Sequence, residues 1–320
     1  MEDTVPSAAG FEEQRRSRWA GSRALVTGAA GFIGSHLARR LSELGAEVHA
    51  VSRRPRAAGH GETWHRADLR DTDATAKLFG SVRPDVVIHL ASEVNGARHR
   101  DVVLPTLESN LASTVNVLSA AADRPDTTVL LTGSAEEPRP GNGQAFPPSP
   151  YAMAKWAASG YAQLFHRLWN VPCTILRPTM VYGPGQRDTA KLVPYVTLSL
   201  LRGEEPSLTS GAKLADWIYV DDVVDAFVAA YDRGEAVGEG FDVGTGTSVS
   251  VREVVELLSR IIGGPARPRF GEVSDRPLDI PQTADPGPAA AVLGWRSTVE
   301  LEEGLKRTVA WYADGHTDDG

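Results

Sequence analysis

The sequence feature with the strongest structural consequence is the glycine-rich stretch TGAAGFIG at positions 27–34. It follows the apolar run Ala24–Thr27 and precedes the amphipathic segment Phe32–Leu44, which predicts a strand, a tight turn and a helix. In such a turn Gly28 permits the chain reversal, Gly31 lets a pyrophosphate approach the backbone, and Gly34 lets the helix pack closely on the strand. The helix N-terminus offers N–H groups and a positive dipole end to the phosphates. The residues expected to contact a dinucleotide are Gly28, Gly31, Phe32, Ile33 and Gly34.

Short apolar runs alternate with helical patterns along the first half of the chain, which predicts parallel strands joined by crossover helices. Strands are expected at 24–27, 47–52, 85–92, 128–132 and 173–177, and helices at 32–44, 105–122 and 151–169. Further on, helices are expected near 190–202, 221–232, 250–262 and 299–311, and short strands near 217–220 and 240–243. We therefore predict an α/β protein, with a Rossmann doubly wound parallel sheet and a smaller C-terminal α/β substrate-binding lobe.

The predicted division of the chain has four parts. Residues 1–20 form a flexible N-terminal extension, and 21–180 form the dinucleotide-binding domain with the catalytic residues. Residues 181–312 form most of the substrate-binding lobe, with some segments returning to the first domain, and 313–320 form a tail.

Charge and cysteine content argue against several classes of partner. The net charge is −8 and no basic stripe is present, so nucleic acid is not an expected partner. The apolar runs are far shorter than the roughly 18 residues that a membrane span needs. A single cysteine, Cys173, cannot form an internal disulfide, which favours a cytoplasmic protein. The histidines show no ligand spacing with cysteine or acidic residues, so no metal site is expected.

The end of the second predicted strand indicates the type of dinucleotide. An acidic residue there would bind the ribose 2′-hydroxyl of NAD, but this chain has Ser52, Arg53 and Arg54. A guanidinium can pair with the 2′-phosphate of NADP(H), which is therefore the favoured cofactor, with NAD(H) as the alternative. Asp68 and Leu69 follow at the place where a short strand usually flanks the adenine.

Tyr151 and Lys155 stand four residues apart at the start of a predicted helix and therefore share one face. Tyrosine has an ordinary pKa of about 10, and a nearby ammonium would stabilise the phenolate and lower that pKa. Ser134 follows the predicted strand 128–132, so its hydroxyl is expected at the same place. We predict that Ser134 bonds the reacting oxygen, Tyr151 transfers the proton, and a hydride moves between substrate and nicotinamide.

With these motifs the chain resembles the extended short-chain dehydrogenase/reductase family, the NAD-dependent epimerase/dehydratases. Matching segments are TGAAGFIG at 27–34, HLAS at 89–92, Asn110, YAMAK at 151–155, VYGPGQ at 181–186, DWIYVDDVV at 216–224 and DVGTG at 242–246. The resemblance implies Ser134, Tyr151 and Lys155 as the catalytic residues and a nucleotide-linked sugar as substrate. Further implied cofactor contacts are Leu90, Ala91, Ser92, Asn110, Thr132, Tyr151, Lys155 and Pro178. Implied substrate contacts are Glu93, Glu136, Met180, Lys191 and Arg276.

Three departures from the family pattern bear on the substrate. Met180 stands where sugar epimerases usually carry an asparagine, and Ala215 stands where many relatives carry a phosphate-binding arginine that Lys213 can replace. The interval from Ser134 to Tyr151 is shorter than in typical sugar epimerases. Arg276 lies in a segment that resembles the family's Arg-Pro-Gly-Asp.

The stretch Ser134–Glu137 resembles the Ser-Ser-Glu-Glu segment of 4-keto-6-deoxymannose reductases and the Thr-Ser-Glu of GDP-mannose dehydratases. Glu136 is therefore a candidate second acid–base group. The favoured reaction is NADPH-dependent reduction of a nucleotide-linked 4-keto-6-deoxyhexose, with Tyr151 as the acid. The alternatives are a nucleotide-sugar 4-epimerase with bound NAD, a 4,6-dehydratase, a reductase of a non-sugar carbonyl, and a cofactor sensor without turnover.

Family members commonly dimerise through the two helices expected here at 105–122 and 151–169, so the resemblance also implies a homodimer. The apolar positions compatible with such a contact are Leu111, Val115, Leu118, Ala157, Tyr161 and Leu164.

Overall fold

The computed structural model describes residues 18–56, 61–138, 146–275 and 281–315. Within these residues the main sheet has seven strands, all parallel to their neighbours. Across the sheet they are β10 (Gly240–Val243), β6 (Cys173–Pro178), β5 (Thr128–Thr132), β4 (Val86–His89), β1 (Arg23–Thr27), β2 (Glu47–Ser52) and β3 (Thr63–Arg66). This arrangement confirms the predicted Rossmann sheet.

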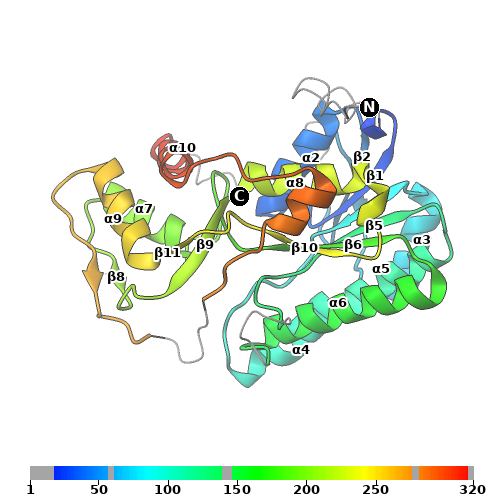
Figure 1. Ribbon diagram of the computed structural model, residues 1–320, viewed down its shortest axis with the longest axis horizontal. Coiled ribbons are helices and arrows are strands. Elements are labelled where there is room, and N and C mark those ends of the chain that lie inside the picture. Colours follow the sequence, from blue (N-terminus) through cyan, green and yellow to red (C-terminus); the bar gives the residue numbers. More distant parts are fainter. Residues whose placement is uncertain (1–17, 57–60, 139–145, 276–280, 316–320) are drawn as a thin grey trace.

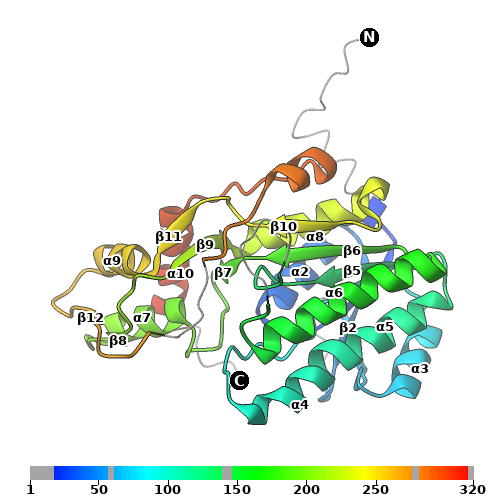
Figure 2. The ribbon, with the colours of Figure 1, turned by 60° about the horizontal axis from the view of Figure 1, so that its bottom comes forward.

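Helices cover both faces of this sheet, as a parallel sheet buried on both sides requires (Figures 1 and 2). One face is covered by α2 (Phe32–Glu43) and α8 (Val220–Asp232). The other face carries α3 (Thr72–Val82), α5 (Ser113–Ala122) and α6 (Pro150–Trp169). The strands contribute alternate residues to the two cores, so Leu25 faces the second group of helices while Val26 faces the first.

The smaller lobe lies beside the sheet, to the left in Figure 1. Its helices are α7 (Leu192–Leu201), α9 (Val251–Ile262) and α10 (Leu301–Ala313). Its described strands are β11 (Ser248–Ser250), β9 (Leu214–Tyr219) and β7 (Met180–Tyr182) in one sheet, and β8 (Ser207–Leu208) with β12 (Arg269–Phe270) in another. A third core, which includes Trp217, Leu258 and Leu305, joins these elements.

The C-terminal half of the chain also builds part of the main sheet. β10 pairs with β6, and α8, η3 (Gly234–Ala236) and η4 (Ala289–Leu293) lie against the sheet outside the smaller lobe. Trp295 packs into the same core and donates its indole N–H to the Asp222 carbonyl at 3.0 Å. Among the described residues, no helix is long and apolar enough to cross a membrane.

Three predicted boundaries differ from the structure. The predicted strand 85–92 ends at His89. The predicted helix 105–122 begins earlier and is interrupted: η1 (Arg100–Val102) leads into α4 (Val103–Thr106), which is followed by a π-helical turn η2 (Leu107–Ala112) and then α5. The predicted extension 1–20 overlaps the folded core, because Trp19 is completely buried and its ring lies 4.5 Å from that of Tyr231.

Candidate active site

The glycine turn between β1 and α2 has the geometry that its sequence predicts. Gly28 has φ +70°, a conformation that favours glycine, and a β-carbon there would lie 2.8 Å from the Ala91 nitrogen. A β-carbon on Gly34 would press on the Gly28 carbonyl oxygen and lie 2.8 Å from the Ala29 Cα. The turn is closed by the Gly31 N–H, which donates to the Gly28 carbonyl at 2.8 Å. A side chain at Gly28 would therefore press on the segment after β4, and one at Gly34 would displace α2 from the turn.

Several polar groups around this turn fit a dinucleotide. Within the described part of the chain, α2 has no side-chain cap, so its first-turn N–H groups are directed outward from the Gly31 end. Buried hydroxyl oxygens of Ser92, after β4, and Thr132, at the end of β5, have no hydrogen-bond partner among the described residues. Buried polar atoms normally have partners, so these two indicate where a ligand's polar groups would lie.

The residues that follow β2 were predicted to choose the cofactor. Arg53 and Arg54 are exposed there, and the Ser52 hydroxyl accepts from the Arg54 N–H at 3.2 Å. Asp68 is paired with Arg70, whose Nη2 lies 2.7 Å from Oδ2 of Asp68. The hydrogen bond from Arg70 is the main reason why the pKa of Asp68 is lowered, and the charge of Arg53 contributes. The acidic group at this edge is therefore already neutralised by an arginine.

A buried network fixes the segment between β4 and the site. The Thr27 hydroxyl accepts from the N–H groups of Leu90 and Ala91, each at 3.1 Å, so it donates to Nδ1 of His89 at 2.8 Å. His89 therefore carries its proton on Nε2. Burial, and then the charge of Lys155, lower the pKa of His89 to about 3, so His89 is neutral near pH 7.

The predicted catalytic residues come together at the carboxyl ends of β5 and β6. The Ser149 hydroxyl caps α6 by accepting from the Ala152 N–H at 3.1 Å, which places Tyr151 in the first turn. Tyr151 is half-buried and hydrogen-bonded to the side chain of Ser134. Burial raises the pKa of Tyr151, and the Glu136 carboxylate raises it further, although the bond to Ser134 lowers it. Together these effects raise the pKa of Tyr151 and favour its protonated form.

Lys155 lies one helical turn after Tyr151, and its side chain is directed to the sheet. Its Nζ donates to the Thr132 carbonyl oxygen at 2.9 Å, and the residue is 4% exposed. Burial lowers the pKa of Lys155 to about 8, against an opposing effect of Glu137. The structure contradicts the prediction that Lys155 lowers the pKa of Tyr151: burial and the Glu136 carboxylate raise that pKa, and Lys155 is not among the groups that shift it.

The two adjacent glutamates after Ser134 differ in environment. Glu136 is half-buried, and its N–H donates to the Ser134 hydroxyl at 3.2 Å. Glu137 is 1% exposed, accepts from the Ser134 N–H at 2.6 Å and from Nε of Arg177 at 3.0 Å. The sequence pattern led to Glu136 and missed Glu137. Which of the two carboxylates is buried depends on the contact with Arg177 of β6, which is distant in sequence.

Three further residues were predicted to contact the cofactor. The Asn110 amide bonds the backbone of Glu93, accepting from its N–H at 2.6 Å and donating to its carbonyl at 3.1 Å, so both ends serve to shape the loop after β4. Pro178 is half-buried at the end of β6, and Leu69 is buried in the core.

The predicted substrate contacts that the structure describes come from different parts of the chain. Glu93 and Met180 are exposed, and Met180 pairs in register with Trp217 of β9. Lys191 precedes α7 and donates to the Val94 carbonyl at 3.4 Å, which connects the lobe with the loop after β4. Arg276 lies outside the described residues. No group of three or more His, Cys, Asp or Glu side chains in the described part of the chain could hold a metal ion.

Comparison with known proteins adds independent information. The sequence profile of the NAD dependent epimerase/dehydratase family matches residues 24–244. A UDP-glucose 4-epimerase of Mycolicibacterium smegmatis is 33% identical, covering 91% of this chain and 98% of that protein. A probable dTDP-glucose 4,6-dehydratase of Sinorhizobium fredii is 29% identical, covering 91% and 93%. The crystal structure of Thermus thermophilus UDP-glucose 4-epimerase with NAD is 28% identical, with a TM-score of 0.78 and coverage of 91% and 98%.

Proposed function

This chain belongs to the NAD-dependent epimerase/dehydratase family, and from that premise we propose that it is a nucleotide-sugar 4-epimerase that retains NAD. The observation that carries the proposal is the convergence of Ser134, Tyr151 and Lys155 at the carboxyl end of β5, in a chain that matches a 4-epimerase over nearly its whole length. This replaces 4-ketoreduction with NADPH, which the sequence motifs favoured, as the first candidate.

The cofactor would be held by the turn Gly28–Gly34, the first turn of α2 and the hydroxyl groups of Ser92 and Thr132. When bound, its nicotinamide supplies a reversible acceptor for the hydrogen on the sugar carbon. Before the oxidative half of the reaction Tyr151 must release its own proton to solvent; its phenolate then takes the proton of the sugar hydroxyl, and the phenol so formed returns that proton in the reductive half. The Ser134 hydroxyl bonds the same oxygen and keeps it in line with the phenol.

A ketoreductase using NADPH is the second candidate, and one observation favours it. Arg53 and Arg54 are exposed beyond β2, and Asp68 is already paired with Arg70. This edge therefore offers a 2′-phosphate two guanidinium groups. A neutral Tyr151 also suits an acid that protonates a ketone. A 4,6-dehydratase is the third candidate and would use Glu136 as the additional acid–base group.

Cofactor retention separates these candidates. We expect NAD(H) to be released when the purified protein is denatured, detected by mass spectrometry, and UDP-glucose to be converted to its C4 epimer without added cofactor. An empty site with at least about tenfold tighter binding of NADPH than of NADH would contradict the epimerase and favour the ketoreductase. In that case Arg53→Ala with Arg54→Ala should abolish the preference, whereas Arg66→Ala, on the neighbouring strand, serves as the matched control.

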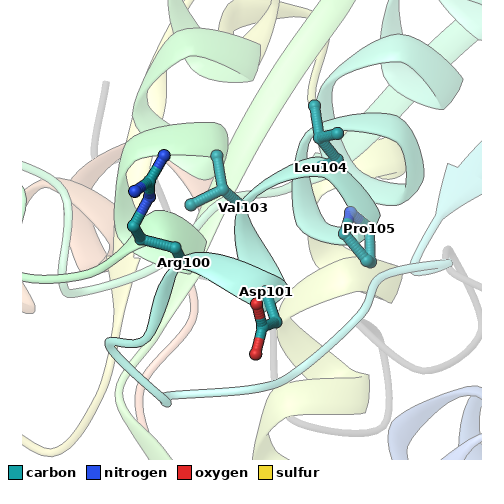
Figure 3. A pocket seen from close by; sticks show the side chains of 5 residues that line it. All are labelled: Arg100, Asp101, Val103, Leu104 and Pro105. Atoms are coloured by element: carbon teal, nitrogen blue, oxygen red, sulfur yellow. The ribbon is translucent and has the colours of Figure 1, made fainter.

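We also propose that the chain forms a homodimer through α4, η2 and α6. These elements expose an unusual number of large apolar side chains: Val103, Leu104, Leu107, Met153, Trp156, Tyr161, Leu164, Leu168 and Trp169. A shallow pocket on this surface is lined by Arg100, Asp101, Val103, Leu104 and Pro105, none of which belongs to the candidate active site (Figure 3). An exposed apolar patch of this kind typically marks an interface. Leu118, a predicted contact, is completely buried in the core and takes no part.

If this surface forms the dimer interface, negative charges placed on it should prevent dimerisation. Trp156→Glu together with Leu164→Glu should convert the dimer to a monomer in light-scattering measurements at micromolar concentration, because two carboxylates would have to be buried. Leu214→Glu, at a similarly exposed leucine in the smaller lobe, should leave the mass unchanged. A monomeric wild-type protein would contradict the proposal.

A further inference from the structure

Glu137 is a buried carboxylate that the proposed reaction does not use. It follows β5 and is 1% exposed. One oxygen, Oε1, accepts from the Ser134 N–H at 2.6 Å, and the other, Oε2, accepts from Nε of Arg177 at 3.0 Å. Arg177 comes from β6 and is itself buried, at 8% exposure. The side chains therefore connect the end of β6 with the backbone of the residue whose hydroxyl meets Tyr151.

Two glycines leave room for the side chains of this pair. A β-carbon on Gly133 would lie 2.6 Å from Oε1 of Glu137 and 2.9 Å from Cγ of Arg177. A β-carbon on Gly240, in β10, would lie 2.5 Å from Nη1 of Arg177. The pair is thus enclosed by the ends of three neighbouring strands. Such enclosure excludes water and preserves one geometry.

The charge of Glu137 also faces the catalytic side chains. It supports the protonated form of Lys155 against burial, and it adds to the effects that keep Tyr151 protonated. The other titratable groups at this place are His89 from β4, which is neutral near pH 7, and Glu136, which faces Tyr151. Glu137 is the carboxylate that acts on Lys155.

We propose that Glu137 is a positioning residue of the active site: held by Arg177, it fixes the backbone of Ser134, and with it the hydroxyl that meets the reacting oxygen, and supplies the negative charge that faces Lys155. The expected effect on turnover rests on the proposed function, whereas the contacts of Glu137 do not depend on it. Glu137 does not touch the substrate and acts through Ser134 and Lys155.

The test is Glu137→Gln, which retains an oxygen for the Ser134 N–H but removes the charge and places an amide beside Arg177. We expect kcat to fall by about 10²-fold, because displacements of about 1 Å at a catalytic group have effects of that size. KM should change by less than about threefold, since the substrate is not contacted. The alkaline limb of the kcat profile should move to lower pH, because Lys155 loses the charge that supports its protonated form.

Two further variants make the test decisive. Glu137→Gln combined with Arg177→Met removes both members of the pair and avoids an unpaired buried guanidinium, so it is used if the single variant does not fold. Asp85→Asn is the matched control: Asp85 also accepts from a backbone N–H and a guanidinium, both of Arg23, at 2.8 Å and 2.9 Å, at the opposite ends of the strands. It should lower the Tm and leave kcat and its pH profile unchanged.

A readout without substrate keeps this proposal separate from the proposed function. The free energy of unfolding is measured by urea denaturation between pH 7 and pH 11. It should rise with pH where Lys155 loses its proton in the folded protein, and the part of the rise that is absent in Lys155→Met is assigned to Lys155. In Glu137→Gln that rise should begin at lower pH than in wild type. An unmoved rise together with an unchanged kcat profile would overturn the positioning role. Absence of turnover in wild type, with the rise moved, would count against the epimerase alone.

Discussion

Replacing Tyr151 by phenylalanine should lower turnover by about 10²- to 10⁴-fold, the usual contribution of a positioned acid–base group. The phenyl ring keeps the shape of the side chain in the first turn of α6 but has no proton to exchange with the substrate oxygen. The Ser134 hydroxyl loses one of its two hydrogen-bond partners and keeps the Glu136 N–H, so a small fall in stability accompanies the change. Affinity for the dinucleotide should stay within about threefold, as measured by fluorescence titration.

Tyr161→Phe is the matched control, because Tyr161 lies on the same helix and is 42% exposed at the surface. It should leave turnover unchanged. If Tyr151→Phe retains wild-type turnover with any substrate that the protein converts, the assigned chemistry is wrong. If it loses affinity for the dinucleotide as severely as turnover, the residue serves binding and not proton transfer.

Replacing Lys155 by methionine should have two opposite effects, a loss of turnover of about 10²-fold or more and a gain in stability at pH 7. The pKa of Lys155 falls from 10.5 to about 8 on folding, chiefly because of burial. Each pKa unit corresponds to about 1.4 kcal/mol, so the buried ammonium costs about 3 kcal/mol. Loss of the bond to Thr132 offsets about 1 kcal/mol. The net gain in the free energy of unfolding should be about 2 kcal/mol.

The sign of this effect depends on pH in a defined way. Between about pH 8 and pH 10.5 the unfolded chain holds a proton on Lys155 that the folded protein has released. Stability of the wild type therefore rises through this window, and the penalty is fully present below it. The advantage of Lys155→Met should shrink as the pH rises toward 10.5. Lys306→Met, at an exposed lysine paired with Glu302, should leave stability nearly unchanged at any pH, because surface ion pairs contribute little.

Features that depend on neighbours in sequence were predictable. The strand, glycine turn and helix at 24–44 are a local unit, and Gly28 requires its positive φ whatever the rest of the chain does. Tyr151 and Lys155 share a helix face because they are four residues apart. The parallel sheet followed from the alternation of strands and helices, and its confirmation shows that this alternation is a strong signal.

Features that depend on distant contacts were not predictable. Glu137 and Arg177 are separated by 40 residues, and nothing in the pattern distinguishes Glu137 from Glu136. Likewise, the direction of the Tyr151 pKa shift was predicted incorrectly, because burial and the Glu136 carboxylate outweigh the bond to Ser134, and the Lys155 ammonium donates to Thr132. The direction of such a pKa shift depends on how deeply the side chain is buried and on how the neighbouring charges are oriented, which the helical spacing does not specify.

The contribution of the C-terminal half to the main sheet has a thermodynamic consequence. β10 provides the backbone partner of β6, and α8 supplies one wall of the sheet's core, which includes Phe227 and Phe241. Melting the C-terminal half would leave β6 with an unpaired edge and strip apolar cover from β1 and β4. Heat or urea should therefore unfold both lobes in a single cooperative transition, and a fragment that ends near residue 180 should aggregate instead of folding by itself.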